Sequence, residues 1–355
     1  MRSLFRRRLL PAILLLSTSP AAAQFFMRAY GPLGTIFHPP NYYASSFDAA
    51  VSPTGYVLTL YTGSVCLLDQ SGIPQTSATF QRSTAPTAGN MYLTDVEVEG
   101  SANFYHMQLG LDTLTVVKTN AGTNIGWQAA MLGASESGRL LPTSDGGCAF
   151  LHSVGPSTGL RAAIVRYTAN GSVAWRKAYR IEGNSGSFTA TAIASTTDGG
   201  FLIAGKYFSG TEQKPYVCRI STTGIVQWAR EIAPANGGQS ACLALTELPN
   251  GNVRVAIQYP QVGMTLSLAD LSSSGGFIGS WGYQGAGFSA ASLRFGTDGS
   301  AYGVGGNASL VFRLAPDGSP VFAVQQNGPV GTNMVTQKLT PTPDGNQVML
   351  GNYTT

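Results

Sequence analysis

One phrase recurs along the chain at nearly constant spacing. Thr196–Gly205 reads TTDGGFLIAG, and Thr143–Leu151 reads TSDGGCAFL. In looser form the phrase occurs seven times, and each copy places a glycine between two short runs rich in apolar residues. These glycines are Gly55, Gly100, Gly146, Gly199, Gly251, Gly299 and Gly345, at spacings of 45, 46, 53, 52, 48 and 46 residues. Self-similarity at such a period indicates a repeat architecture.

A second phrase alternates with the first. Val165–Tyr179 and Cys218–Ile232 each place a tryptophan four residues after a turn glycine. We interpret both phrases as β-hairpins, because Asp-Gly and Asn-Gly tolerate the positive φ angles of tight turns. Two hairpins make four strands per repeat, which is typical of a propeller blade. The sequence therefore predicts an all-β fold, a seven-bladed β-propeller of four-stranded antiparallel blades, with each tryptophan wedged between blades.

The two ends of the chain are predicted to share the last blade. Gln24–Gly31 aligns with Ala174–Arg180, which belongs to the last strand of a repeat. The seventh repeat begins near Thr342, and the sequence stops at Thr355, before a third strand. We therefore expect a last blade that is split between the N- and C-termini and incomplete, and a reading frame that continues past Thr355.

The first residues have the features of a secretory signal peptide. Four arginines precede the apolar run Leu9–Leu16, and Ala21-Ala22-Ala23 fits an A-x-A cleavage site. The apolar run is too short to span a bilayer, which takes about 20 residues. We predict that residues 1–23 are a signal peptide cleaved near Ala23, and that residues 24–355 form the propeller.

Removal of this segment changes the charge balance. The chain has 21 Lys and Arg against 17 Asp and Glu. Residues 1–23 hold four Arg and no acid, so the remaining chain has 17 of each and is formally neutral. A neutral protein offers no electrostatic basis for binding nucleic acid or an anionic membrane. We expect a monomer that neither binds nucleic acid nor spans a membrane.

Residues suited to catalysis are scattered. His38, His106 and His152 fall in three different repeats without a recurring acidic partner, so no nucleophile–His–acid arrangement is predicted. The D-x-[DN]-x-[DN]-G calcium pattern is absent from the sequence, and we predict no metal and no cofactor. The catalytic set is therefore expected to be empty.

The four cysteines are Cys66, Cys148, Cys218 and Cys242, and their wide spacing does not fit a zinc site. A disulfide between Cys218 and Cys242 is one interpretation for an exported chain. We favour the other, in which they are small buried residues within strands.

The two alternating phrases, of the form DGGfliaG and G-x-x-x-W, resemble the propeller repeats of secreted Bacteroidetes proteins. The resemblance covers nearly all of residues 24–355 and is strongest around Thr143–Ile232. Proteins of this group often end in a sorting domain for type IX secretion. The resemblance implies a protein that is secreted or on the outer surface of a Gram-negative bacterium. It implies no shared catalytic residues.

One predicted loop is rich in aromatic residues. Gly31–Ser46 connects the first mature strand to the first repeat, and loops on one face of a propeller commonly form its binding surface. Aromatic rings beside amides suit stacking on sugars or peptides. The predicted ligand-binding residues are Phe37, His38, Asn41, Tyr42 and Tyr43. The alternative is that these aromatic residues cover the end of the core. Phe188 and Phe288 are expected in comparable loops.

Two functions remain open from the sequence. The first is an exported, non-enzymatic propeller that acts as a binding or scaffold module at the cell surface, with a glycan or protein ligand. The alternative is a propeller-fold enzyme, a hydrolase or lyase, that acts on extracellular glycans, since propellers host many chemistries. The second function requires ionisable side chains that converge at one mouth of the central channel.

Overall fold

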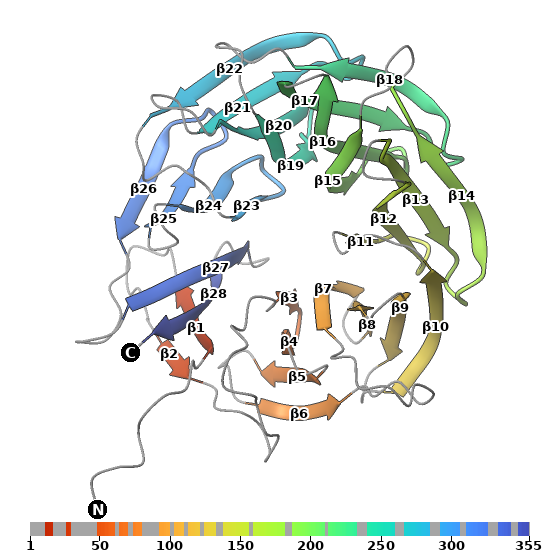
Figure 1. Ribbon diagram of the computed structural model, residues 1–355. Helices are drawn as coiled ribbons and strands as arrows, with labels where there is room; N and C mark the ends of the chain where they lie inside the picture. The colour runs from red at the N-terminus through yellow and green to blue at the C-terminus, as the bar shows by residue number, and fades with distance from the viewer. Residues whose placement is uncertain are drawn as a thin grey trace, which may run out of the picture.

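The computed structural model shows a ring of antiparallel sheets (Figure 1). The structure describes residues 11–16, 26–29, 48–60, 64–69, 74–79, 92–99, 103–109, 113–120, 124–132, 138–155, 159–181, 187–209, 212–232, 240–259, 266–284, 292–305, 310–325, 333–341 and 347–354.

Six of the described sheets are blades made of four consecutive strands, numbered here from the N-terminus. Blade 1 comprises β3 (Asp48–Ser52), β4 (Gly55–Leu60), β5 (Ser64–Asp69) and β6 (Pro74–Thr79). Blade 2 comprises β7 (Tyr92–Glu99), β8 (Asn103–Leu109), β9 (Thr113–Asn120) and β10 (Asn124–Leu132). Blade 3 comprises β11 (Arg139–Pro142), β12 (Cys148–Val154), β13 (Arg161–Tyr167) and β14 (Val173–Tyr179).

The next three blades follow the same plan. Blade 4 comprises β15 (Phe188–Ser195), β16 (Phe201–Ser209), β17 (Glu212–Ile220) and β18 (Val226–Glu231). Blade 5 comprises β19 (Ala241–Glu247), β20 (Val253–Gln258), β21 (Leu266–Leu271) and β22 (Phe277–Tyr283). Blade 6 comprises β23 (Ser292–Phe295), β24 (Ala301–Gly305), β25 (Leu310–Leu314) and β26 (Pro320–Gln325).

A further four-stranded sheet joins the two ends of the chain and is called the terminal sheet. Its strand order is β2-β1-β28-β27, formed by β1 (Pro11–Leu16), β2 (Phe26–Ala29), β27 (Asn333–Pro341) and β28 (Gln347–Thr354). The first strand of each blade lies nearest the centre of the ring, and β27 contacts both β23 and β3, which closes the circle (Figure 1).

The predicted count of seven blades is corrected to six. Among the described residues of 24–355, three strands belong to the terminal sheet, which are β2, β27 and β28. The third-strand place, between β28 and β2, is occupied by β1, which comes from the segment predicted to be a signal peptide. The prediction that both ends share one sheet is met, whereas a reading frame that continues past Thr355 stays a prediction.

The repeated Asp-Gly phrase forms the first hairpin turn of a blade, as predicted. In blade 4 the Thr196 N–H bonds to the Gly200 carbonyl at 3.0 Å, and Gly199 N–H to the Thr196 carbonyl at 2.9 Å. Gly199 has a φ of +78°, which favours glycine, while the Asp198 carboxylate accepts the Gly200 N–H at 3.2 Å. The glycine thus supplies the backbone angle, and the aspartate supplies a side-chain acceptor.

The hydrophobic core lies between neighbouring sheets. Leu202 and Val217 of blade 4 pack in one buried cluster with Val255 and Ala269 of blade 5. Residues from β21 of blade 5 are buried on both faces, in contrast to the exposed outer strand β22. Burial on both faces explains why the third strands read as apolar runs rather than as an alternation.

Tryptophans on outer strands contact the following blade. The ring of Trp228 in blade 4 lies over Gly275 of blade 5, and its Nε1 donates to the Ser273 carbonyl at 2.8 Å. Trp127 makes the same kind of bond to the Ala169 carbonyl at 3.1 Å. These contacts confirm that the tryptophans pack between blades.

Cys148, Cys218 and Cys242 are buried and free, which confirms for these three the interpretation as small core residues. The disulfide between Cys218 and Cys242 is therefore not formed. Among the described residues, no helix is long and apolar enough to cross a membrane.

Candidate functional site

Inner strands of successive blades are linked by carboxylates. The Asp48 carboxylate on β3 accepts the N–H of Val96 on β7 at 3.0 Å. The Asp95 carboxylate on β7 accepts the N–H of Leu140 on β11 at 2.6 Å. Both aspartates are almost completely buried, and each supplies an acceptor to a backbone N–H of the next blade. These two carboxylates therefore hold neighbouring blades together at their inner strands.

Asp95 reaches the next blade because β7 has a β-bulge. The register between β7 and β8 shifts between Leu93 and Val96, so one extra residue of β7 is accommodated there. In blade 4 the corresponding shift in β15 places Thr191, whose hydroxyl donates to the Cys242 carbonyl of blade 5 at 2.6 Å. In blades 2 and 4 the bulge residue thus bonds to the inner strand of the next blade. In blade 2 this residue is the charged Asp95, and in blade 4 it is the uncharged Thr191.

An ion pair crosses the ring. Glu97 of β7 and Arg294 of β23 are 197 residues apart, and the Arg294 Nη2 lies 3.1 Å from the Glu97 Oε1. Blades 2 and 6 lie on opposite sides of the centre, separated by blade 1 and the terminal sheet on one side (Figure 1). The side chains of Glu97 and Arg294 are 24% and 28% exposed. This pair therefore joins two sides of the ring directly.

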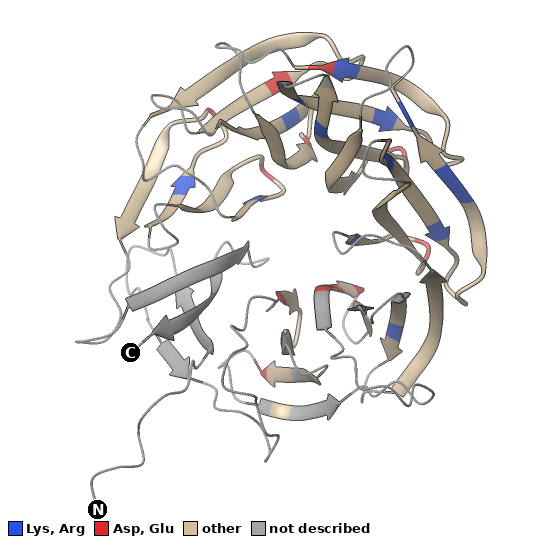
Figure 2. Cartoon of the chain, in the orientation of Figure 1, with Lys and Arg blue, Asp and Glu red and all other residues tan. Residues whose placement is uncertain are grey.

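Arg139 completes a group of four charges that we call the channel cluster, formed by Asp95, Glu97, Arg139 and Arg294. Arg139 is the first residue of β11 and is exposed, and its Nη1 donates to the Gly138 carbonyl at 3.0 Å. Its positive charge acts on both carboxyls of the cluster. Figure 2 shows basic positions on β11 and β23 and acidic positions on β3 and β7 near the centre of the ring.

Burial raises the pKa of both carboxyls in the channel cluster. For Asp95 the attraction of Arg139 and the hydrogen bond from Leu140 oppose this rise in pKa. For Glu97 the attraction of Arg294 opposes the rise in pKa, while the negative charge of Asp95 adds to it. The two guanidinium groups are suited to binding an anion, and the two carboxyls are acceptors when ionised.

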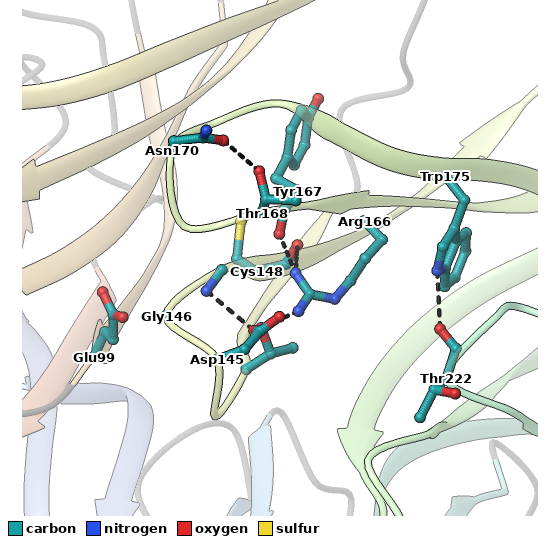
Figure 3. A network of polar contacts seen from close by, with 12 residues as sticks. Glu99, Asp145, Gly146, Cys148, Arg166, Tyr167, Thr168, Asn170, Trp175 and Thr222 are labelled. Atoms are coloured by element: carbon teal, nitrogen blue, oxygen red, sulfur yellow. Dashed lines mark hydrogen bonds and ion pairs between the residues drawn. The ribbon is translucent and has the colours of Figure 1, made fainter.

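A second set of charges lies at the hairpin turns and is structural. Arg166 of β13 pairs with Asp145 in the first turn of blade 3 and also donates to the Cys148 carbonyl at 3.3 Å (Figure 3). In blade 4, Arg219 occupies the corresponding place and pairs with Asp198 at 3.2 Å and with Glu247 of blade 5 at 2.8 Å. The repetition of this arrangement shows that these pairs belong to the blade architecture.

Blade 5 reverses this arrangement. Asp270 of β21 stands where the third strands of neighbouring blades carry arginine, and the arginine is Arg254 on β20. The two side chains form a bidentate pair, with both N–O distances at 2.7 Å. The guanidinium carbon of Arg254 also lies 4.9 Å from the Trp281 ring centroid, and its Nη1 donates to the Gly299 carbonyl of blade 6 at 3.0 Å.

Both described histidines belong to the core. The His152 ring stacks on Phe150 with centroids 5.0 Å apart, and burial together with the Arg176 charge lowers the pKa of His152 to about 4. Burial lowers the pKa of His106 to about 3. Both imidazoles are therefore neutral at pH 7. Among the described residues no group of His, Cys, Asp and Glu is arranged to hold a metal ion.

The ligand-binding residues predicted from the sequence are Phe37, His38, Asn41, Tyr42 and Tyr43, and all of them lie outside the described residues. Phe288 also lies outside them. The prediction for Phe188 is wrong: this residue begins β15, is 2% exposed, and packs edge-on against Tyr216 with ring centroids 5.5 Å apart. Phe188 therefore belongs to the hydrophobic core and not to a connecting loop.

Sequence reasoning missed the channel cluster because its residues do not recur. When β15 is aligned with β7 at the β-bulge, Thr191 corresponds to Asp95 and Ile193 corresponds to Glu97. The available signal was a pair of acids on an inner strand, at positions that are uncharged in another repeat.

No family model matches the chain, and no curated protein matches it by sequence. Several solved structures are similar to it. Virginiamycin B lyase from Staphylococcus aureus is 11% identical with a TM-score of 0.57, and the match covers 88% of this chain and 96% of that one. BamB from Moraxella catarrhalis is 11% identical with a TM-score of 0.50, covering 93% and 88%. Sqt1 from Saccharomyces cerevisiae is 9% identical with a TM-score of 0.55, covering 85% and 83%. At these identities the likeness shows the β-propeller fold alone.

Proposed function

We propose that this protein is an exported, non-enzymatic β-propeller that serves as a binding or scaffold module at the cell surface, with a glycan as its first expected ligand. The observation that carries the proposal is the engagement of the channel carboxylates. Asp95 is bonded to the Leu140 N–H, and Glu97 is paired with Arg294. A general acid or base must reach the proton that it transfers, and both groups are already bonded within the protein.

Export is proposed from the N-terminal sequence. The arginines before Leu9–Leu16 and the alanines at 21–23 support cleavage near Ala23. The resemblance of the repeats to those of secreted Bacteroidetes proteins supports a location outside the cell, in the medium or on the outer surface. N-terminal sequencing of the secreted protein tests this step, and Gln24 is the expected first residue.

The proposed contact surface includes the aromatic loop Gly31–Ser46. Replacing Tyr42 and Tyr43 by alanine is expected to abolish retention of the protein on immobilised glycans and to leave the melting temperature unchanged. If the variant loses retention and its melting temperature also falls, the two rings belong to the core instead. The matched control is Phe188→Ala, which removes a buried ring and is expected to lower the melting temperature.

A second candidate function is hydrolysis or lysis of extracellular glycans. One observation favours it: Asp95 and Glu97 are two residues apart on β7, the inner strand of blade 2, and burial raises the pKa of both. Glycoside hydrolases use two carboxyl groups, one of them with a raised pKa. The solved structures of similar fold include one named as a lyase, which speaks for that protein alone.

The two candidates differ in the effect of Glu97→Gln. A glycan-degrading enzyme that used Glu97 would lose turnover by at least about a hundredfold in this variant. A binding module produces no cleavage products in the wild type, so the substitution has no turnover to remove.

A further inference from the structure

Arg139 is the member of the channel cluster that is most available to a ligand. Its side chain is exposed, and its one described hydrogen bond uses Nη1 and the adjacent Gly138 carbonyl. Within the described part of the chain, no carboxylate lies within 4.0 Å of its guanidinium, whereas Arg294 is paired with Glu97. The planar fork of an arginine matches a carboxylate with two parallel hydrogen bonds. An exposed guanidinium on an inner strand can therefore receive an anionic group from solution.

The neighbours of Arg139 limit the kind of anion. Asp95 and Glu97 both feel the charge of Arg139. Like charges repel, so two nearby carboxylates, when ionised, disfavour a group that concentrates two negative charges at one point, such as a phosphate. Ionised carboxylates accept hydrogen bonds from hydroxyl groups. The cluster therefore fits a ligand that presents to it a single carboxylate with several hydroxyl donors around it.

We propose that the channel cluster recognises the carboxylate of an acidic sugar, with Arg139 as its main contact. The ligand carboxylate accepts hydrogen bonds from the Arg139 fork, and the sugar hydroxyls donate to Oε2 of Glu97, since Oε1 carries the bond to Arg294. A peptide C-terminus offers the same carboxylate but few hydroxyl donors, so a sugar acid complements the cluster better. This inference rests on the proposed glycan binding and names the ligand chemistry within it.

The buried member of the cluster positions the rest. Asp95 is 3% exposed and is bonded to the N–H of Leu140, the residue after Arg139. This bond fixes the start of β11 relative to β7. Asp95 is thus a positioning residue, and Arg139 and Glu97 are the groups that contact the ligand.

The test is a calorimetric titration of the purified protein with trigalacturonate, and with neutral galactotriose as the matched ligand. We expect the wild type to bind trigalacturonate more tightly than galactotriose. Arg139→Gln is expected to weaken trigalacturonate binding by at least about tenfold, because a charge-assisted pair is lost, and to leave galactotriose binding unchanged. Arg139→Lys keeps the positive charge but loses the planar fork, so its affinity for trigalacturonate should lie between those of the wild type and Arg139→Gln.

The control variant is Arg161→Gln, which removes an exposed arginine from β13, away from the inner strands. It should bind trigalacturonate as the wild type does. Both arginines are exposed, so both variants should fold, and their melting temperatures verify this.

Three results would overturn the inference: no preference for trigalacturonate in the wild type, equal affinity in Arg139→Gln, or stronger binding of a tripeptide with a free C-terminus. If the protein still binds neutral glycans through Tyr42 and Tyr43, the proposed function holds and only the recognition of an acidic sugar is contradicted. If no glycan of either kind is retained, both proposals fail.

Discussion

Trp175 of blade 3 donates its indole N–H to the backbone carbonyl of Thr222 in blade 4, with an Nε1–O distance of 2.9 Å (Figure 3). The acceptor lies in the second hairpin turn of the next blade, 47 residues along the chain. Neighbouring blades are therefore joined at their outer strands by a bond that the repeat itself places. Stability of the ring depends on such contacts between blades as well as on pairing within them.

Replacing Trp175 by phenylalanine tests this bond. The ring is largely kept and the N–H donor is lost, so we expect a loss of about 1 kcal/mol in the free energy of unfolding. Trp228→Phe should behave alike, since its Nε1 also donates to a carbonyl. Trp281→Phe should cost less, because no acceptor of its indole N–H is described. Denaturant titration of the three variants measures the difference, and equal losses would contradict the assignment.

The turn beneath each tryptophan requires glycine for two reasons. Gly275 has a φ of +83°, and an added Cβ would lie 2.8 Å from the Trp228 ring. Gly251 has a φ of +80°, but an added Cβ would meet no atom within 4 Å. Gly251→Ala should therefore cost about 1 kcal/mol for the backbone angle alone. Gly275→Ala should cost more, by displacing the tryptophan. Thermal unfolding of both variants measures the difference. Similar melting temperatures would show that the Trp228 ring moves aside without a loss of stability.

The reversed pair in blade 5 should be sensitive to loss of one partner. Asp270→Ala leaves the nearly buried Arg254 guanidinium without its bidentate carboxylate, and we expect destabilisation of about 3 to 5 kcal/mol. Asp317→Ala is the control, because that carboxylate is exposed and bonds within its own turn. Unfolding curves that place the two variants together would contradict the structural role of the Arg254–Asp270 pair.

The pH dependence of stability should differ between two kinds of aspartate. Burial raises the pKa of Asp95, so its stabilising contribution is present below its unfolded-state pKa of about 4 and is lost as the pH rises through its folded-state pKa. The hydrogen bond from Thr196 lowers the pKa of Asp198, so its contribution is present above about pH 4 and is lost as the pH falls.

Asparagine variants separate these effects. Relative to the wild type, Asp95→Asn should gain stability as the pH rises from about 4 to 7, because the cost of burying a charge is removed. Asp198→Asn should lose stability relative to the wild type over the same change. Free energies of unfolding measured across this range give both signs, and parallel curves for the two variants would contradict the assignment of burial as the cause at Asp95.

The sequence predicted what recurs and missed what occurs once. Turn glycines such as Gly199 and tryptophans such as Trp175 fall at repeated positions, so their roles followed from spacing and turn chemistry. The channel cluster did not follow, because Glu97 and Arg294 are brought together only by closure of the ring. A pair separated by 197 residues leaves no local pattern.

Two further differences have physical causes. The terminal sheet gains β1 in the place of a blade's third strand, because third strands are apolar runs and Pro11–Leu16 is one. Phe188 was expected in a loop, but the strand begins at this residue and buries the ring against Tyr216. Strand boundaries next to loops depend on packing with distant residues, which spacing alone does not reveal.

The most direct test of the proposed function is affinity electrophoresis of the purified protein through gels that contain polysaccharides, with analysis of each polysaccharide for cleavage products. The proposal of a non-enzymatic binding module predicts retarded migration in at least one gel and no products in any. Release of oligosaccharides that stops in Glu97→Gln would contradict it and would assign the channel cluster to catalysis.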